Sequence, residues 1–215
     1  MEELYSRLAP VWNTALTVTG FKRGLCDYVI KTLEEFEGHE LKVLDVGCGT
    51  GLLSFAVLKN FPNAEVVATD LNEEMVKETE LLARHKGVDR DRLTVGVANV
   101  LDQDQVKLSN GKNYHLKPSS FDVVIASGVL EYTPLEPALK KLLGITKTGG
   151  LLIIVSVKDD PVGNLWGKIY KFKPLKEEDI EDSLVRSGCS FVKKKPLTLK
   201  DFPANVTRTG HLAIK

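Results

Sequence analysis

Short apolar runs alternate with amphipathic stretches along most of the chain. Unbroken apolar runs of strand length are typical of buried strands, and we expect strands over Leu41–Val46, Glu65–Asp70, Leu93–Val97, Phe121–Ser127 and Leu151–Val157. Apolar positions at helical spacing predict helices between them, over Gly51–Asn60, from Asn72 to about Lys86, and over Pro134–Thr146. Strands and helices in alternation indicate an α/β fold with a parallel sheet covered on both faces.

The two ends of the chain add to this pattern. Residues 1–40 are predicted to be helical, with a short amphipathic piece around Tyr5–Asn13 and a longer helix from Phe21. A last helix over Leu175–Arg186 precedes two strands, Ser190–Thr198 and Val206–Ile214, whose short connection favours antiparallel pairing. Residues 98–119 are predicted to be a polar loop. No repeat or linker divides the chain, so 1–215 is expected to be one domain.

Composition narrows the class of protein. The 29 basic and 29 acidic residues give zero formal charge, which argues against general attraction to nucleic acid. Three widely spaced cysteines without a C-x-x-C pair exclude a zinc ribbon, and no metal site is expected. No secretory leader or run of about 20 apolar residues is visible, so we expect a cytoplasmic protein without a membrane segment. Oligomeric state is left open.

The segment Val43–Ser54 is the strongest motif. A buried strand runs into Gly47, Gly49 and Gly51, and a helix follows. This G-x-G-x-G spacing differs from the G-x-G-x-x-G of dinucleotide sites, and no Lys-Ser/Thr pair makes it a phosphate loop. Asp45, two residues before Gly47, would repel a pyrophosphate but can receive an amine. Cys48 is interpreted as a small packing residue.

Asp70 ends the second strand, so a doubly wound sheet places its carboxylate beside the glycine turn, where it can accept both hydroxyls of a ribose. The expected ligand therefore has a ribose and an amino group but no phosphates. S-adenosylmethionine fits this description.

The chain resembles the class I S-adenosylmethionine-dependent methyltransferases. Four segments carry the resemblance in the family's order, and they are Val43–Ser54, Val67–Asn72, Ser120–Val124 with Ser127–Tyr132, and Gly149–Ile153. The resemblance covers residues 41–157 and extends to the closing strands. It implies a Rossmann-like seven-stranded sheet with order 3-2-1-4-5-7-6, strand 7 antiparallel, and an N-terminal helical cap.

The resemblance also implies roles for particular residues. Backbone at Gly47, Cys48, Gly49 and Gly51 would approach the cofactor, with Asp45 near its amino group. Asp70 is expected to hold the ribose, and Leu71 with Ala98 to contact the adenine ring. Asn99 is expected to bind the adenine amine, and Ser127 with Gly128 to line the methionine chain.

Catalysis is expected to depend mainly on positioning, because methyl transfer from a sulfonium is an in-line displacement. Any general base should follow strand 4, where Glu131 and Tyr132 are the candidates. A surface position for Glu131 and packing of Tyr132 against the end of the sheet are equally good interpretations.

A small-molecule acceptor is the leading hypothesis. Tyr5–Asn13 is similar to the N-terminal cap of quinone-biosynthesis methyltransferases, and the aromatic segment Trp166–Phe172 would form an opposite wall. The Pro-Pro-aromatic motif of DNA amino-methyltransferases is missing after strand 4, as is the acidic pair expected for aminopropyl transfer. A protein or RNA methyltransferase and a non-catalytic cofactor-binding protein are the alternatives.

Overall fold

A computed structural model describes residues 20–102 and 105–215 of the chain. The short helix predicted around Tyr5–Asn13 lies outside the described residues. The remaining predicted strands and helices are present, with boundaries that move by a few residues.

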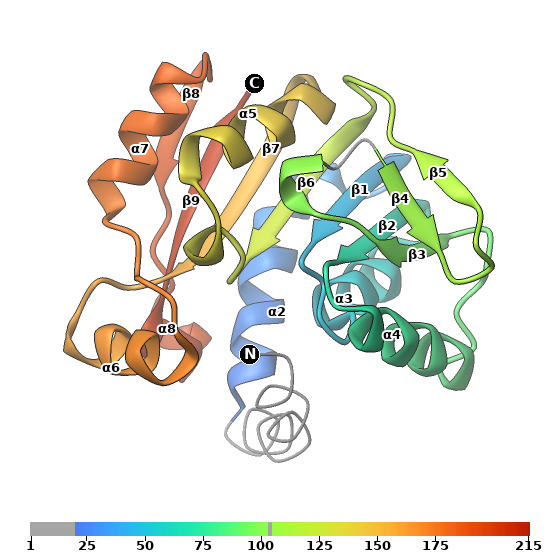
Figure 1. Cartoon of the computed structure of the whole chain (residues 1–215), viewed down its shortest axis with the longest axis horizontal. Coiled ribbons are helices and arrows are strands. Elements are labelled where there is room, and N and C mark those ends of the chain that lie inside the picture. Colours follow the sequence, from blue (N-terminus) through green and yellow to red (C-terminus); the bar gives the residue numbers. More distant parts are fainter. Residues whose placement is uncertain (1–19, 103–104) are drawn as a thin grey trace.

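One nine-stranded sheet forms the centre of the molecule (Figure 1). Its order is β5-β4-β3-β2-β1-β6-β7-β9-β8. The strand bounds are β1 Leu41–Val46, β2 Ala64–Asp70, β3 Leu93–Val97, β4 Gln105–Leu108, β5 Asn113–His115, β6 Phe121–Ser127, β7 Thr146–Val157, β8 Phe191–Lys194 and β9 Arg208–Ile214. Strands β3, β2, β1, β6 and β7 run parallel, whereas β9 is antiparallel to β7 and β8. Without β4 and β5, this is the predicted order of seven strands.

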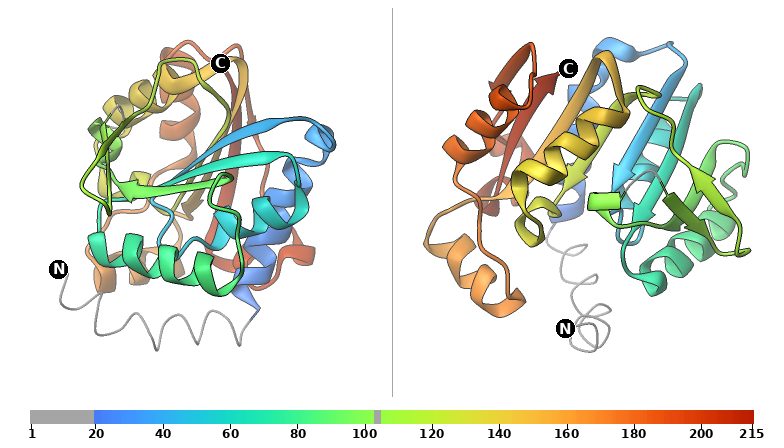
Figure 2. Two further views of the ribbon diagram at one scale, coloured as in Figure 1. Left: turned by 90° about the vertical axis from the view of Figure 1, so that its right-hand side faces the viewer. Right: turned by 45° about the horizontal axis from the view of Figure 1, so that its top comes forward.

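Helices cover both faces of the sheet (Figures 1 and 2). Those of ten residues or more are α2 Phe21–Thr32, α4 Glu73–His85, α5 Leu135–Ile145, α6 Pro161–Tyr170 and α7 Glu177–Arg186, and the shorter ones are α3 Leu52–Asn60 and α8 Ala204–Thr207. Single turns of 3₁₀ helix lie at η1 Glu34–Phe36, η2 Val100–Asp102, η3 Leu130–Tyr132 and η4 Leu199–Asp201.

Alternation along the strands divides the core between these faces. In β1, Val43 packs with residues of α2 and α3, while Leu44 packs on the opposite side with residues of α5 and α7. Both side chains are fully buried. A strand that buries both faces reads as a continuous apolar run, which is why these strands could be recognised in the sequence.

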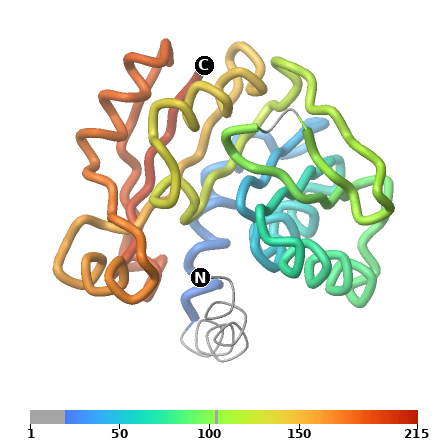
Figure 3. The backbone as a smooth tube through the Cα atoms, in the orientation of Figure 1, coloured from blue at the N-terminus to red at the C-terminus, as the bar shows by residue number. Residues whose placement is uncertain are grey.

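The region predicted as a polar loop over residues 98–119 is different in the structure. Strands β4 and β5 form an antiparallel hairpin that extends the sheet beyond β3 (Figure 3). Val106 is fully buried in β4 between the exposed residues Gln105 and Lys107. Leu108 and Tyr114 also pack against the core, but the apolar positions of these short strands are too few for period-based prediction. The segment 109–112 joins the two strands.

Candidate functional site

The candidate site lies where the parallel strands end. In the sheet, Val46 of β1 pairs with Thr69 of β2 and with Ala126 of β6. Asp70 of β2 pairs with Val97 of β3. The residues that follow β1, β2, β3 and β6 therefore meet at one edge of the sheet. This brings together the predicted cofactor positions, namely the glycine turn, Asp70–Leu71, Ala98–Asn99 and Ser127–Gly128. Ligands of open α/β sheets bind at this edge, beyond the carboxyl ends of the strands.

Asp70 is bonded directly to the glycine turn. The Gly49 N–H donates to Asp70 Oδ2 at 2.8 Å, and the Asn72 N–H donates to Oδ1 at 2.9 Å. Each carboxylate oxygen keeps lone pairs for a further donor. Burial raises the pKa of Asp70, while the backbone donors oppose this shift. The structure thus fixes the carboxylate beside the turn, as its position at the end of the second strand predicted.

The three glycines of the turn serve different needs. All three have positive φ, at +63° for Gly47, +54° for Gly49 and +78° for Gly51. A Cβ on Gly47 would lie 2.1 Å from Val129 Cγ2, so this residue permits close contact with the loop after β6. A Cβ on Gly49 would meet no atom within 4 Å. The space beside Gly49 is open, and it is where a bound molecule can approach the backbone.

Thr79 holds the turn from the opposite side. Its hydroxyl donates to the Gly49 carbonyl at 2.8 Å, and its side chain is fully buried in α4. A Cβ on Gly51 would lie 2.8 Å from Thr79 Cγ2. Sequence reasoning did not single out this residue. The available signal was a threonine three positions after Val76, on the buried face of the predicted helix.

Asp45 has a structural role at the start of α3. Its Oδ2 accepts hydrogen bonds from the Ser54 N–H at 3.0 Å and the Ser54 hydroxyl at 2.6 Å, in the first turn of α3. The side chain is 2% exposed, and burial raises its pKa to about 6, although the bonds from Ser54 oppose the rise. Asp45 therefore ties the end of β1 to α3. Contact with a cofactor amino group stays a prediction.

The predicted adenine positions have clear local surroundings. Leu71 is 69% exposed directly after Asp70, so its side chain is open to contact from a ligand. Ala98 is buried, and its N–H donates to the Asp70 carbonyl at 3.0 Å. Asn99 is exposed, with Oδ1 accepting from the Leu101 N–H at 2.9 Å. Leu71 and Asn99 are accessible to a ligand at this edge of the sheet.

The two catalytic candidates differ in environment. Glu131 is 8% exposed, and its Oε1 accepts from the Val157 N–H at 2.6 Å. The interpretation of Glu131 as a surface residue is therefore wrong, because its side chain is buried and accepts a hydrogen bond at the end of β7. Burial raises its pKa, and Arg208 opposes this. Tyr132 is 49% exposed, with its ring 5.3 Å from that of Phe172, beyond α6.

The loop that carries these residues is attached to the neighbouring strand. The Gly128 N–H, at φ +68°, donates to the Val155 carbonyl at 2.9 Å. Ser127, the last residue of β6, is paired with Val155 in the sheet and is half-buried. The end of β6 and the loop after it are thus anchored to β7 on one side and to the glycine turn, through Val129, on the other.

Other chemistry is not apparent among the described residues. Cys48 is buried, and burial holds the pKa of its thiol well above the usual value, so it is not an activated nucleophile. No cluster of three or more metal-ligating side chains occurs in the described part of the chain. None of the described helices is long and apolar enough to cross a membrane.

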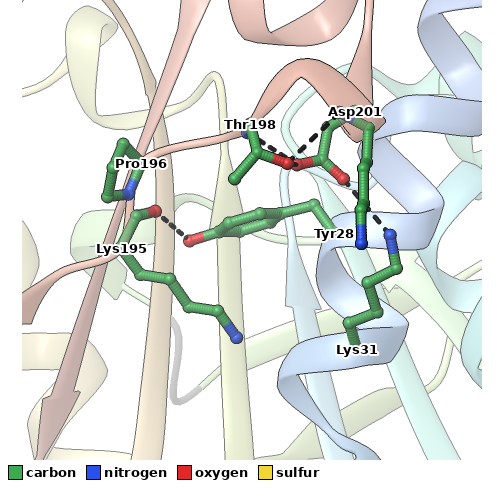
Figure 4. A pocket seen from close by; sticks show the side chains of 7 residues that line it. Tyr28, Lys31, Lys195, Pro196, Thr198 and Asp201 are labelled. Atoms are coloured by element: carbon green, nitrogen blue, oxygen red, sulfur yellow. Dashed lines mark hydrogen bonds and ion pairs between the residues drawn. The ribbon is translucent and has the colours of Figure 1, made fainter.

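A cavity of about 250 Å³ takes its lining from α2 and the segment after β8, and from none of the cofactor positions (Figure 4). The Tyr28 hydroxyl donates to the Lys195 carbonyl at 2.7 Å, and Lys31 Nζ lies 3.7 Å from Asp201 Oδ1. These contacts join α2 to the η4 region. The cavity is thus part of the packing of these elements.

Comparison with known proteins agrees with this geometry. The profile of the methyltransferase domain family matches residues 44–152, from the glycine turn to β7. The chain belongs to this family. The predicted membership of the class I S-adenosylmethionine-dependent methyltransferases is thereby confirmed.

Relatives of this methyltransferase-family chain have different acceptors in their names. A ubiquinone biosynthesis O-methyltransferase of Idiomarina loihiensis is 36% identical over 100 residues, which are 46% of this chain and 35% of that protein. A ribosomal RNA small subunit methyltransferase G of Streptococcus pyogenes is 28% identical over 164 residues, 73% of this chain and 64% of that one. The chain thus spans less than two thirds of these relatives.

Among solved structures, a magnesium protoporphyrin IX methyltransferase from Synechocystis with bound S-adenosylhomocysteine superposes with a TM-score of 0.65. The identity is 20%, over 91% of this chain and 84% of that one. A likeness at this identity confirms the Rossmann-like fold.

Proposed function

We propose that this chain is an S-adenosylmethionine-dependent methyltransferase that acts on a small-molecule acceptor. The observation that carries the proposal is the bond between Gly49 and Asp70, with open space beside the glycine, in a chain of the methyltransferase domain family. Exposed Leu71 next to Asp70 supplies an apolar surface for a base. A ribose-binding carboxylate, an accessible backbone and an apolar surface are what this cofactor needs.

The residues of the site would each contact a different part of the cofactor. Asp70 would accept hydrogen bonds from the ribose hydroxyls, while Leu71 and Ala98 would contact the adenine ring and Asn99 its amine. The turn from Gly47 to Gly51 would lie along the methionine part, as would Ser127 and Gly128. When bound, the cofactor supplies an electrophilic methyl group.

The contribution of the protein is mainly orientation and exclusion of water. Glu131 fits a positioning role, because its bond to the Val157 N–H joins η3 to the end of β7. Tyr132 is accessible and contacts Phe172, so it is the better candidate for touching the acceptor. These two residues would set the distance and angle between acceptor and methyl group.

A small acceptor is favoured by the state of the one tight basic run, Lys193–Lys195. Lys194 pairs with Glu177 of α7, and Lys195 donates to the Thr32 hydroxyl at 3.0 Å. Two of the three lysines are therefore engaged within the fold, which argues against this run as a binding site for RNA phosphates. The aromatic residues at the end of α6 and after it suit an apolar or aromatic acceptor.

Two measurements test the proposal. Calorimetry should detect binding of S-adenosylhomocysteine, and absence of binding would refute the cofactor assignment. A radiolabelled methyl assay on a cell lysate, separated into macromolecules and metabolites, should then place the label among metabolites. Label in RNA or protein would favour the alternative methyltransferase, while binding without any labelled product would indicate a non-catalytic protein.

A further inference from the structure

Helix α6 rests mainly on the chain segments that lead into it and out of it. Of Pro161–Tyr170, only Gly163 and Gly167 are buried. A Cβ on Gly163 would lie 1.9 Å from the Lys158 carbonyl oxygen, and one on Gly167 would lie 2.6 Å from that of Phe172. The two glycines, one turn apart, form the inner edge of the helix. Larger side chains are consequently directed elsewhere, and α6 lies at the periphery of the molecule (Figures 1 and 2).

The outer side of α6 is apolar. Val162 is 43% exposed, Leu165 58% and Ile169 44%. Spacing of three and then four residues places them on one face of a helix. Three aliphatic side chains exposed together on one face of a helix are typical of an interaction surface.

The charge around α6 is positive, although the whole chain is neutral. Residues 158–176 contain five lysines and two aspartates. Lys168, Lys171 and Lys173 are all exposed. Both aspartates are engaged at the start of the helix, where Asp160 accepts from the Gly163 N–H at 2.7 Å and Asp159 accepts from the Asn164 amide at 2.8 Å. The positive charge therefore dominates the later part of α6 and residues 171–176, and it ends at the acidic first turn of α7.

We propose that α6 is an interfacial helix that docks this protein onto an anionic lipid surface. Val162, Leu165 and Ile169 would enter the boundary between headgroups and acyl chains, and the lysines would meet the lipid charges. An apolar face with flanking lysines is the pattern that binds such interfaces. A helix of ten residues with three aliphatic anchors gives reversible attachment. Charge complementarity selects the lipid surface over an apolar protein groove.

The place of the helix adds weight to this assignment. Phe172, two residues after α6, contacts Tyr132 at the proposed acceptor side of the site. Docking through α6 would bring that side of the molecule close to the lipid. The docking itself does not depend on methyltransferase activity, so it can be tested separately.

The experiment is co-sedimentation of the full chain with vesicles. Two compositions are compared, phosphatidylcholine alone and phosphatidylcholine with phosphatidylglycerol. Binding is expected to the anionic vesicles, to weaken as salt is added, and to fall at least about tenfold in the double variant Leu165→Gln with Ile169→Gln. A second variant, Lys168→Gln with Lys173→Gln, should lose most of the preference for anionic vesicles.

Leu81→Gln is the matched control, because Leu81 is a 45% exposed leucine on α4 and away from α6. It should bind vesicles like the unchanged protein. Circular dichroism and thermal unfolding show that each variant is folded. The proposal is overturned if the unchanged protein ignores anionic vesicles, or if the α6 variants bind as well as Leu81→Gln. It is also overturned if the α6 variants instead abolish a dimer seen by sedimentation velocity.

Discussion

Substitution of Gly49 by alanine separates a binding role of the glycine turn from a structural one. Gly49 has φ +54°, and a Cβ there would touch no protein atom within 4 Å. An L residue in the left-handed region costs about 1–2 kcal/mol. The reduced freedom of the unfolded chain returns roughly 0.4–1 kcal/mol. The expected net loss in the free energy of unfolding is therefore about 1 kcal/mol, or a melting temperature about 2–4 °C lower.

The effect on the cofactor should be much larger. The new methyl group would occupy the open space where we place the bound molecule, so affinity for S-adenosylhomocysteine should fall at least tenfold, about 1.4 kcal/mol. Gly87→Ala is the matched control, since Gly87 has φ +65° with no atom near its Cβ position and lies at the opposite end of α4 from Asp70. It should lose the same stability and no affinity.

Calorimetry measures the affinity of the two variants for S-adenosylhomocysteine, and urea unfolding measures their free energies of unfolding. Unchanged affinity in Gly49→Ala would refute the assignment of this space to the cofactor. Equal losses of affinity in both variants would trace the effect to stability, and the reasoning from local geometry would then be wrong.

Three further predictions concern the acidic residues. Asp70→Ala should weaken S-adenosylhomocysteine binding by several-fold or more, as measured by calorimetry, because the ribose hydroxyls lose their acceptor; unchanged affinity would exclude that role. Burial raises the Asp45 pKa from 3.8 to about 6, so the folded state favours the protonated form, and this stabilising contribution is lost as pH rises through that range. Urea unfolding across this range should show the unchanged protein losing about 3 kcal/mol relative to Asp45→Asn, and parallel stability curves would contradict it. Glu131→Gln keeps an acceptor for the Val157 N–H, so kcat should fall only a few-fold; a loss of about 100-fold with an altered pH profile would instead make Glu131 the base.

Local pattern was sufficient for the seven strands common to the prediction and the structure, and for bringing the predicted cofactor residues to one edge of the sheet. The parallel strands are buried on both faces, which leaves continuous apolar runs, and the turn needs glycines where φ is positive. Asp70 could be placed beside the turn because carboxyl ends of neighbouring parallel strands meet at one edge. Asn72 was expected to begin the next helix, and its side chain does accept from the Glu74 N–H at 2.8 Å. Each of these features is encoded within a few residues.

What only the tertiary structure decided is how distant segments satisfy the polar groups of the site. Asp45 is hydrogen-bonded to Ser54, and Thr79 is hydrogen-bonded to Gly49. Glu131 is hydrogen-bonded to Val157, which is 26 residues away in the sequence. No spacing rule predicts such partners, because a buried donor or acceptor takes whichever group the packing places within reach. The hairpin β4–β5 depends in the same way on Val106, Leu108 and Tyr114 packing against the core. Sequence alone thus predicted which residues gather at the candidate cofactor edge, and packing determined which distant groups hold those residues in place.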